Sequence, residues 1–176
     1  MGRKFLLFCG ILSSLLYIAM NIFFPFLYKG YNSVSQTVSE LSAIGTPTRV
    51  LWVWIATGYT LLVTAFGWGV LKSGNGNRPL RIAGALLFAY GFVSFIWPFA
   101  PMHQREALAA GEKSLSDTIH LLLAMVTVLI MTTAMGFGAA AFGKKFRVYS
   151  IVTVLVLLVF GLLTAMDAPN IEKNLP

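Results

Sequence analysis

Residues 118–142 read TIHLLLAMVTVLIMTTAMGFGAAAF, a run that contains no Asp, Glu, Lys or Arg. A helix needs about 20 predominantly apolar residues to cross the roughly 30 Å hydrocarbon core of a bilayer, so this run is long enough to span it. Lipid cannot hydrogen-bond to an open backbone, and the run is too long for a barrel strand. We therefore expect a transmembrane helix here, and a fold built from such helices.

Similar apolar runs recur along the chain. The five expected spans are residues 5–28, 50–71, 82–99, 118–142 and 148–166. Only 11% of the 176 residues are charged, against roughly 25% in soluble domains. No remaining segment is long enough for a soluble domain. We predict an all-α, multi-pass transmembrane bundle that forms a single membrane domain over residues 1–176 and has the lipid bilayer as its partner.

The formal net charge of +7 would point to nucleic acid in a soluble protein. Here the basic residues flank the apolar runs as orientation signals, and no basic run with interleaved aromatics offers a surface for stacking bases. We expect no nucleic-acid partner, and nothing in the sequence indicates a protein partner. Cys9 is the only cysteine, so an intramolecular disulfide and a Cys-rich metal site are both excluded.

The distribution of Lys and Arg predicts the orientation of the chain in the membrane. One side of the membrane receives eight of them: Arg3, Lys4, Lys72, Arg78, Arg81, Lys144, Lys145 and Arg147. The other side receives five: Lys29, Arg49, Arg105, Lys113 and Lys173. Because short loops rich in Lys and Arg face the cytoplasm, the N-terminus is predicted to be cytoplasmic.

The acidic residues and the histidines all fall on the predicted outer side. They are Glu40, Glu106, Glu112, Asp117, Asp167 and Glu172, with His103 and His120. Any chemistry of ionisable side chains is therefore expected on that face. A simpler interpretation is that the outer loops are only longer and more polar than the inner ones.

The first outer loop is predicted to hold a short helix over residues 33–43. Val34, Val38 and Leu41 recur at helical spacing, and Thr37 and Glu40 have the spacing of a capping box. We expect this helix to lie on the outer membrane surface or inside the mouth of the bundle.

Polar residues from several segments are expected to converge on that mouth. Asp117 and His120 are three residues apart and share a helix face, and an ionisable residue within a span usually faces the bundle interior. His103 follows the third span, Asp167 ends the fifth, and Glu40 belongs to the outer helix. His120 and Asp117 are the candidate catalytic pair, with Asp117 fixing the tautomer of His120. Glu40 and Asp167 are the candidate substrate-binding residues.

Three interpretations of this cluster remain open. In the first, His103, His120 and Asp117 bind a divalent metal such as zinc, because two imidazoles with oxygen ligands suit that ion. The second is an acid–base or ligand-binding pocket without metal, in which Asp117 orients His120. In the third, Asp117 only stabilises a helix N-terminus, His120 is a hydrogen-bonded bundle residue, and the other polar residues are solvated.

Two motifs carry a resemblance to a known family. Residues 35–47 read SQTVSELSAIGTP after the first span, and residues 97–103 read WPFAPMH before the Asp117–His120 pair. Over essentially its whole length the chain resembles the DUF998 family of bacterial and archaeal membrane proteins of unknown function. The resemblance implies the plasma membrane of a prokaryote. Relatives usually continue past an Asn-Leu-Pro like that at 174–176 into a sixth span, which leaves open that this sequence is truncated.

These observations predict a functional site on the outer face of the protein. We expect an integral membrane protein with a polar His/Asp/Glu pocket on its outer face, which binds or hydrolyses a lipid-like or small amphipathic substrate. The alternative is a non-enzymatic structural or accessory membrane protein.

The predicted orientation can be tested by cysteine labelling. Cysteines placed at Ser33 and Ser114 should react with an impermeant thiol reagent added to intact spheroplasts, because both positions lie in predicted outer loops. Labelling of a cysteine at Ser73 instead would show that the orientation is reversed.

Overall fold

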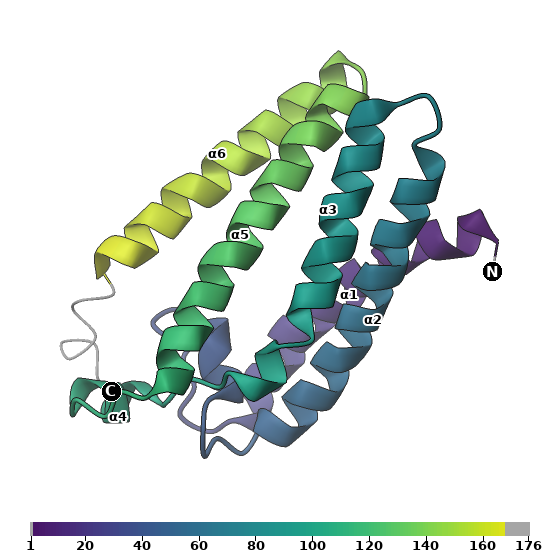
Figure 1. Ribbon diagram of the computed structural model, residues 1–176. Coiled ribbons are helices and arrows are strands. Elements are labelled where there is room, and N and C mark those ends of the chain that lie inside the picture. The colour runs from purple at the N-terminus through teal and green to yellow at the C-terminus, as the bar shows by residue number, and fades with distance from the viewer. Residues whose placement is uncertain (1, 168–176) are drawn as a thin grey trace.

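The computed structural model describes residues 2–167, and within them the chain is all-α, with no strand (Figure 1). Five helices in this range are long and apolar enough to cross a membrane, which confirms the predicted multi-pass bundle. Four of them lie in α1 (Arg3–Leu27), α2 (Arg49–Ser73), α5 (Leu115–Ala141) and α6 (Lys144–Asp167). The other runs over Arg78–Phe99 and consists of α3 (Arg78–Ser94) and the turns that follow it.

Short elements occupy one end of the bundle. The 3-10 helix η1 (Val38–Ser42) lies between α1 and α2, while the 3-10 turn η2 (Trp97–Phe99) and the short helix α4 (Arg105–Ala109) lie between α3 and α5. We call this end the η1 end. The two connections are joined there by a backbone hydrogen bond of 2.9 Å from the Ile44 N–H to the Met102 carbonyl.

The close approach of α2 and α3 depends on glycine. A Cβ atom added to Gly67 would lie 2.3 Å from the backbone nitrogen of Phe88, and one added to Gly84 would lie 2.3 Å from that of Leu71. Small residues allow helix backbones to approach in membranes, where van der Waals packing replaces the hydrophobic effect as the force between helices. These glycines therefore set the spacing of the two helices.

Helix α6 covers the bundle much less than the other spans. It packs on α5, and Figure 1 shows it diverging from α5 toward its C-terminal end. Its large apolar side chains are exposed along the helix, with Leu157, Phe160 and Leu163 among them. Such a surface is the expected one for a helix that faces lipid tails.

The predicted outer helix is shorter than expected and lies in the mouth of the bundle. The helical part is a 3-10 turn over Val38–Ser42, and the capping box is formed, with the Thr37 N–H donating to Glu40 Oε1 at 2.9 Å. Leu41 packs into a buried cluster with Met20, Phe24 and Trp52. Val34 does not share that face, because it belongs to a preceding turn in which Asn32 Oδ1 accepts its N–H, and it is 97% exposed.

The third span also ends differently. The α-helix stops at Ser94, and residues up to Phe99 continue as a hydrogen-bonded turn and then a 3-10 turn instead of the α-helix expected to residue 99. Pro98 explains this ending, because it has no N–H to donate and it disfavours α geometry in the residue before it.

The glycine contacts between α2 and α3 predict opposite effects for two matched substitutions. Gly84→Ala places a methyl group against the α2 backbone and should lower the thermal midpoint of unfolding in detergent micelles. Gly58→Ala lies on α2 with nothing within 4 Å of the added Cβ, so it should raise or preserve stability, by up to about 1 kcal/mol from helix propensity. Equal stabilisation by both substitutions would contradict the close packing.

Candidate functional site

The carboxylate of Asp117 joins the α3–α5 connection to the start of α5. Asp117 Oδ1 accepts the His103 N–H at 2.7 Å, and Oδ2 lies 2.8 Å from His103 Nδ1. Oδ2 also accepts the N–H and the hydroxyl of Ser114, at 2.9 and 2.8 Å, so the capping box of α5 is complete. An ionised carboxylate only accepts hydrogen bonds, so His103 Nδ1 carries the proton.

The imidazole of His120 makes a different set of contacts, one turn further along α5. Its Nδ1 lies 2.7 Å from the Ala100 carbonyl and its Nε2 lies 3.1 Å from the Ser39 hydroxyl. A carbonyl only accepts, so Nδ1 carries a proton, and in the neutral ring Nε2 is the acceptor for the Ser39 hydroxyl. The Trp97 ring packs edge-on against His120, with 4.7 Å between ring centroids.

The tautomer of His120 is thus fixed by Ala100 and not, as expected, by Asp117. The two residues share a helix face, but the Asp117 carboxylate is turned toward the first turn of α5 and bonds to Ser114 and His103. Ser39 was not among the candidate residues. Its partner is 81 residues away in the sequence, so no local spacing could have revealed the contact.

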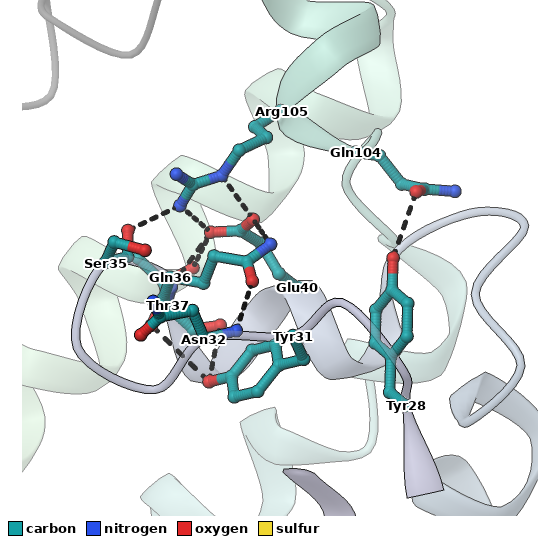
Figure 2. A network of polar contacts seen from close by, with 9 residues as sticks. All are labelled: Tyr28, Tyr31, Asn32, Ser35, Gln36, Thr37, Glu40, Gln104 and Arg105. Carbon is teal, nitrogen blue, oxygen red and sulfur yellow. Dashed lines mark hydrogen bonds and ion pairs between the residues drawn. The ribbon is translucent and has the colours of Figure 1, made fainter. Parts of the chain in front are cut away.

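Glu40 belongs to a buried ion pair with Arg105 (Figure 2). Arg105 Nε donates to Glu40 Oε2 and its Nη2 to Oε1, both at 2.8 Å, and the side chains are only 5% and 6% exposed. Gln36 Nε2 donates to Oε2 at 3.0 Å, and Arg105 Nη2 also donates to the Ser35 carbonyl at 2.6 Å. The pair ties α4 to η1.

This network also changes the acidity of both partners. Burial by itself would raise the pKa of Glu40, but the hydrogen bonds from Arg105, the Thr37 N–H and Gln36 outweigh it and hold the pKa below the ordinary value. The hydrogen bond to Glu40 raises the pKa of Arg105 against the opposing effect of burial. Both groups are therefore held in their charged forms.

A cavity of about 220 Å³ lies at the η1 end, beside the turn that carries Glu40, and extends into the bundle. Ser39, His120 and Arg49 line its polar end. The Tyr59 and Tyr90 hydroxyls, 3.2 Å apart, also line it, and Tyr59 is ten residues beyond Arg49 on α2, which is about 15 Å along a helix. The walls between are largely apolar and aromatic, including Met20, Trp52, Val53, Ala56, Phe95 and Trp97.

Arg49 places a positive charge at the polar end of the cavity. Its Nη1 donates to the Ser42 carbonyl at 2.8 Å and its Nη2 to the Pro98 carbonyl at 3.4 Å. Among the side chains that the structure describes, the ion pairs are Glu40–Arg105 and His103–Asp117, so none of the described carboxylates pairs with Arg49. Glu40 is not among the described residues that line the cavity.

The metal-binding interpretation stays a prediction. Within the described part of the chain, no three His, Cys, Asp or Glu side chains are grouped so that they could hold a metal ion. Both ring nitrogens of His120 already contact Ala100 and Ser39, and coordination would have to displace one of them. Asp167 is the last residue of α6, and its side chain lies outside the described part of the structure.

Comparison with known proteins now adds to the geometry. The family profile described as "Protein of unknown function (DUF998)" matches residues 11–172. The chain belongs to the DUF998 family. Searches of curated proteins and of solved structures find no match. The match confirms the resemblance carried by the motifs in residues 35–47 and 97–103. Residues of both motifs line the polar end of the cavity.

The Glu40–Arg105 pair predicts a large effect of truncating one partner. Arg105→Ala leaves a buried carboxylate without its cation, and the free energy of unfolding in detergent micelles should fall by about 3–5 kcal/mol. Lys113→Ala removes an exposed cation at the same end and should change it by less than about 0.5 kcal/mol.

The stability of the wild-type protein should also depend on pH through the ionisation of Glu40. Because folding lowers the pKa of Glu40, this residue stabilises the folded state fully above its ordinary pKa of 4.5. The contribution of Glu40 to the free energy of unfolding is lost as the pH falls through the pKa of the folded state. Glu40→Gln should reduce this loss of stability in acid. Wild-type stability that is unchanged below the ordinary pKa would contradict the assignment.

Proposed function

We propose that this DUF998 protein binds a small amphipathic, lipid-like ligand in the cavity between η1, α1, α2, α3 and α5. The observation that supports the proposal is the combination of one cationic, polar end with an apolar interior inside a membrane bundle. Small-molecule sites are typically concave and mostly apolar, with a few polar groups that fix orientation. The alternative is a non-enzymatic structural or accessory role.

The size of the cavity favours a single-chain ligand. Drug-sized ligands occupy pockets of roughly 300–1,000 Å³, and this cavity of about 220 Å³ is smaller. One acyl chain along the Met20–Tyr59 wall, with its anionic group beside Arg49 and Ser42, fits such a space. A lipid with two chains exceeds it.

The polar end is expected to decide which ligand binds. An apolar chain that leaves the bilayer for the cavity exchanges one apolar environment for another, so its burial adds little affinity. A charge-assisted hydrogen bond to Arg49 in a low-dielectric site contributes about 1.5–3 kcal/mol. The ligand is therefore proposed to be anionic at one end.

We further propose that the η1 end faces the outside of a prokaryotic plasma membrane. The support is the excess of Lys and Arg in the loops at the opposite end of the bundle. In this orientation the polar end of the cavity lies at the level of the outer leaflet, from which a lipid-like ligand can enter.

Quenching of tryptophan fluorescence by a brominated fatty acid tests this proposal. Trp52 and Trp97 line the cavity, so in a protein carrying Trp54→Phe and Trp68→Phe the acid should quench saturably. The matching brominated fatty alcohol should bind at least roughly tenfold more weakly, because it lacks the charge that pairs with Arg49.

Two variants complete the test. Arg49→Gln should weaken binding of the acid to the level of the alcohol, whereas Lys29→Gln removes an exposed cation at the same end and should leave it unchanged. Quenching that rises without saturation for both probes, as for simple partition into micelles, would refute the binding proposal.

A further inference from the structure

Ser39 and His120 meet at the polar end of the cavity in the arrangement of a nucleophile and its base. We infer that this pair cleaves an acyl ester bound there, with Ser39 as the nucleophile and His120 as the general base. The inference rests on the proposed function, because both side chains line the cavity proposed to hold the ligand.

The geometry meets the requirements of an activated serine. The 3.1 Å separation of Ser39 Oγ and His120 Nε2 lies within the 2.6–3.2 Å reach expected for a nucleophile and its base. The Ala100 carbonyl accepts from Nδ1 at 2.7 Å and so holds the tautomer in which Nε2 can take up the serine proton. In a catalytic triad a third group, usually a carboxylate, orients the base. Here the Ala100 backbone carbonyl takes that position.

The contact differs from what most serine and threonine hydroxyls in the spanning helices do. In an apolar helix a serine or threonine usually bonds to the carbonyl of the preceding turn. The side chains that do so include Ser14, Thr57, Thr64, Ser73, Ser94, Thr132, Thr153 and Thr164. Ser39 instead directs its hydroxyl to an imidazole from a helix 81 residues away, beside an open space.

A cation lines the end of the cavity at which negative charge would develop. Attack on an ester carbonyl creates an oxyanion, and fixed positive charge in a water-poor site stabilises it strongly. Arg49 lines the same end of the cavity and donates to the carbonyl of Ser42, in the same 3-10 turn as Ser39. The carboxylate product then remains beside the same guanidinium, so a bound fatty acid represents the product state of this reaction.

The reaction balances with water as the second substrate. Ser39 Oγ attacks the ester carbonyl carbon while its proton passes to His120 Nε2. Collapse of the tetrahedral adduct breaks the ester C–O bond, and the proton on Nε2 goes to the leaving alkoxide, which departs as an alcohol. Water then attacks the acyl-Ser39 carbonyl and gives a proton to Nε2, and that proton returns to Ser39 as the carboxylic acid leaves. No metal and no redox step takes part.

An alkyl fluorophosphonate carrying a biotin tests the pair, because this reagent phosphonylates activated serines. The wild-type protein in micelles should be labelled, and peptide mass spectrometry should place the adduct on Ser39. Ser39→Ala should abolish labelling and His120→Gln should lower its rate at least tenfold. Ser33→Ala, at an exposed position of the connection between α1 and α2 that does not line the cavity, should be labelled like the wild type.

The brominated fatty acid separates failure of this inference from failure of the proposed function. Ser39→Ala should keep saturable quenching, which shows that it is folded and has an intact cavity. Saturable quenching of the wild type without an adduct on Ser39, or with an adduct on another serine, overturns the catalytic pair and leaves ligand binding in place. An adduct on Ser39 without saturable quenching supports the catalytic pair and refutes the proposal that the cavity binds an anionic ligand. If the wild type shows neither an adduct on Ser39 nor saturable quenching, both proposals are refuted. The position of the adduct in the wild-type protein tests the catalytic pair even if a variant fails to fold.

Discussion

The ion pair between Glu40 and Arg105 is the contact on which the η1 end depends. It joins two connections that lie 65 residues apart in the sequence, and it is almost completely buried. A buried ion pair gains little net stability, because the attraction of the charges is offset by their desolvation. Its effect here is positional: with Glu40 fixed, the preceding Ser39 is held at the cavity and the following Leu41 is held in the apolar cluster of α1 and α2.

A second set of polar contacts fixes the connection between α3 and α5 beside His120. Asp117 holds the backbone and ring of His103, and the Ser116 hydroxyl donates to the Pro101 carbonyl at 2.6 Å. Between these anchors and η2, the Ala100 carbonyl is turned toward His120. Irregular backbone near membrane depth is tolerated only where its polar groups find partners in the protein or in water. In the side chains that the structure describes, no buried nitrogen or oxygen lacks such a partner.

The cavity is the place where close packing stops. Below the η1 end, α2 and α3 approach until glycine backbones touch, as at Gly67 and Gly84. Nearer the η1 end, Tyr59, Tyr90, Pro98 and Pro101 line a space with one charged end. A ligand from the bilayer is recognised there through polar contacts, because its apolar part is equally well solvated by lipid.

The sequence by itself determined the features that depend on local spacing. The five apolar runs fixed the spans, and the Thr37–Glu40 spacing predicted a capping box that the structure contains. It also placed His103, Asp117 and His120 near one mouth. Only the tertiary structure decided their partners: Arg105 for Glu40, Ser39 and Ala100 for His120, and His103 for Asp117. The reason is physical, since each of these pairs joins segments that meet only when separate helices pack, and the geometry of packing is not encoded in the spacing of residues along one helix.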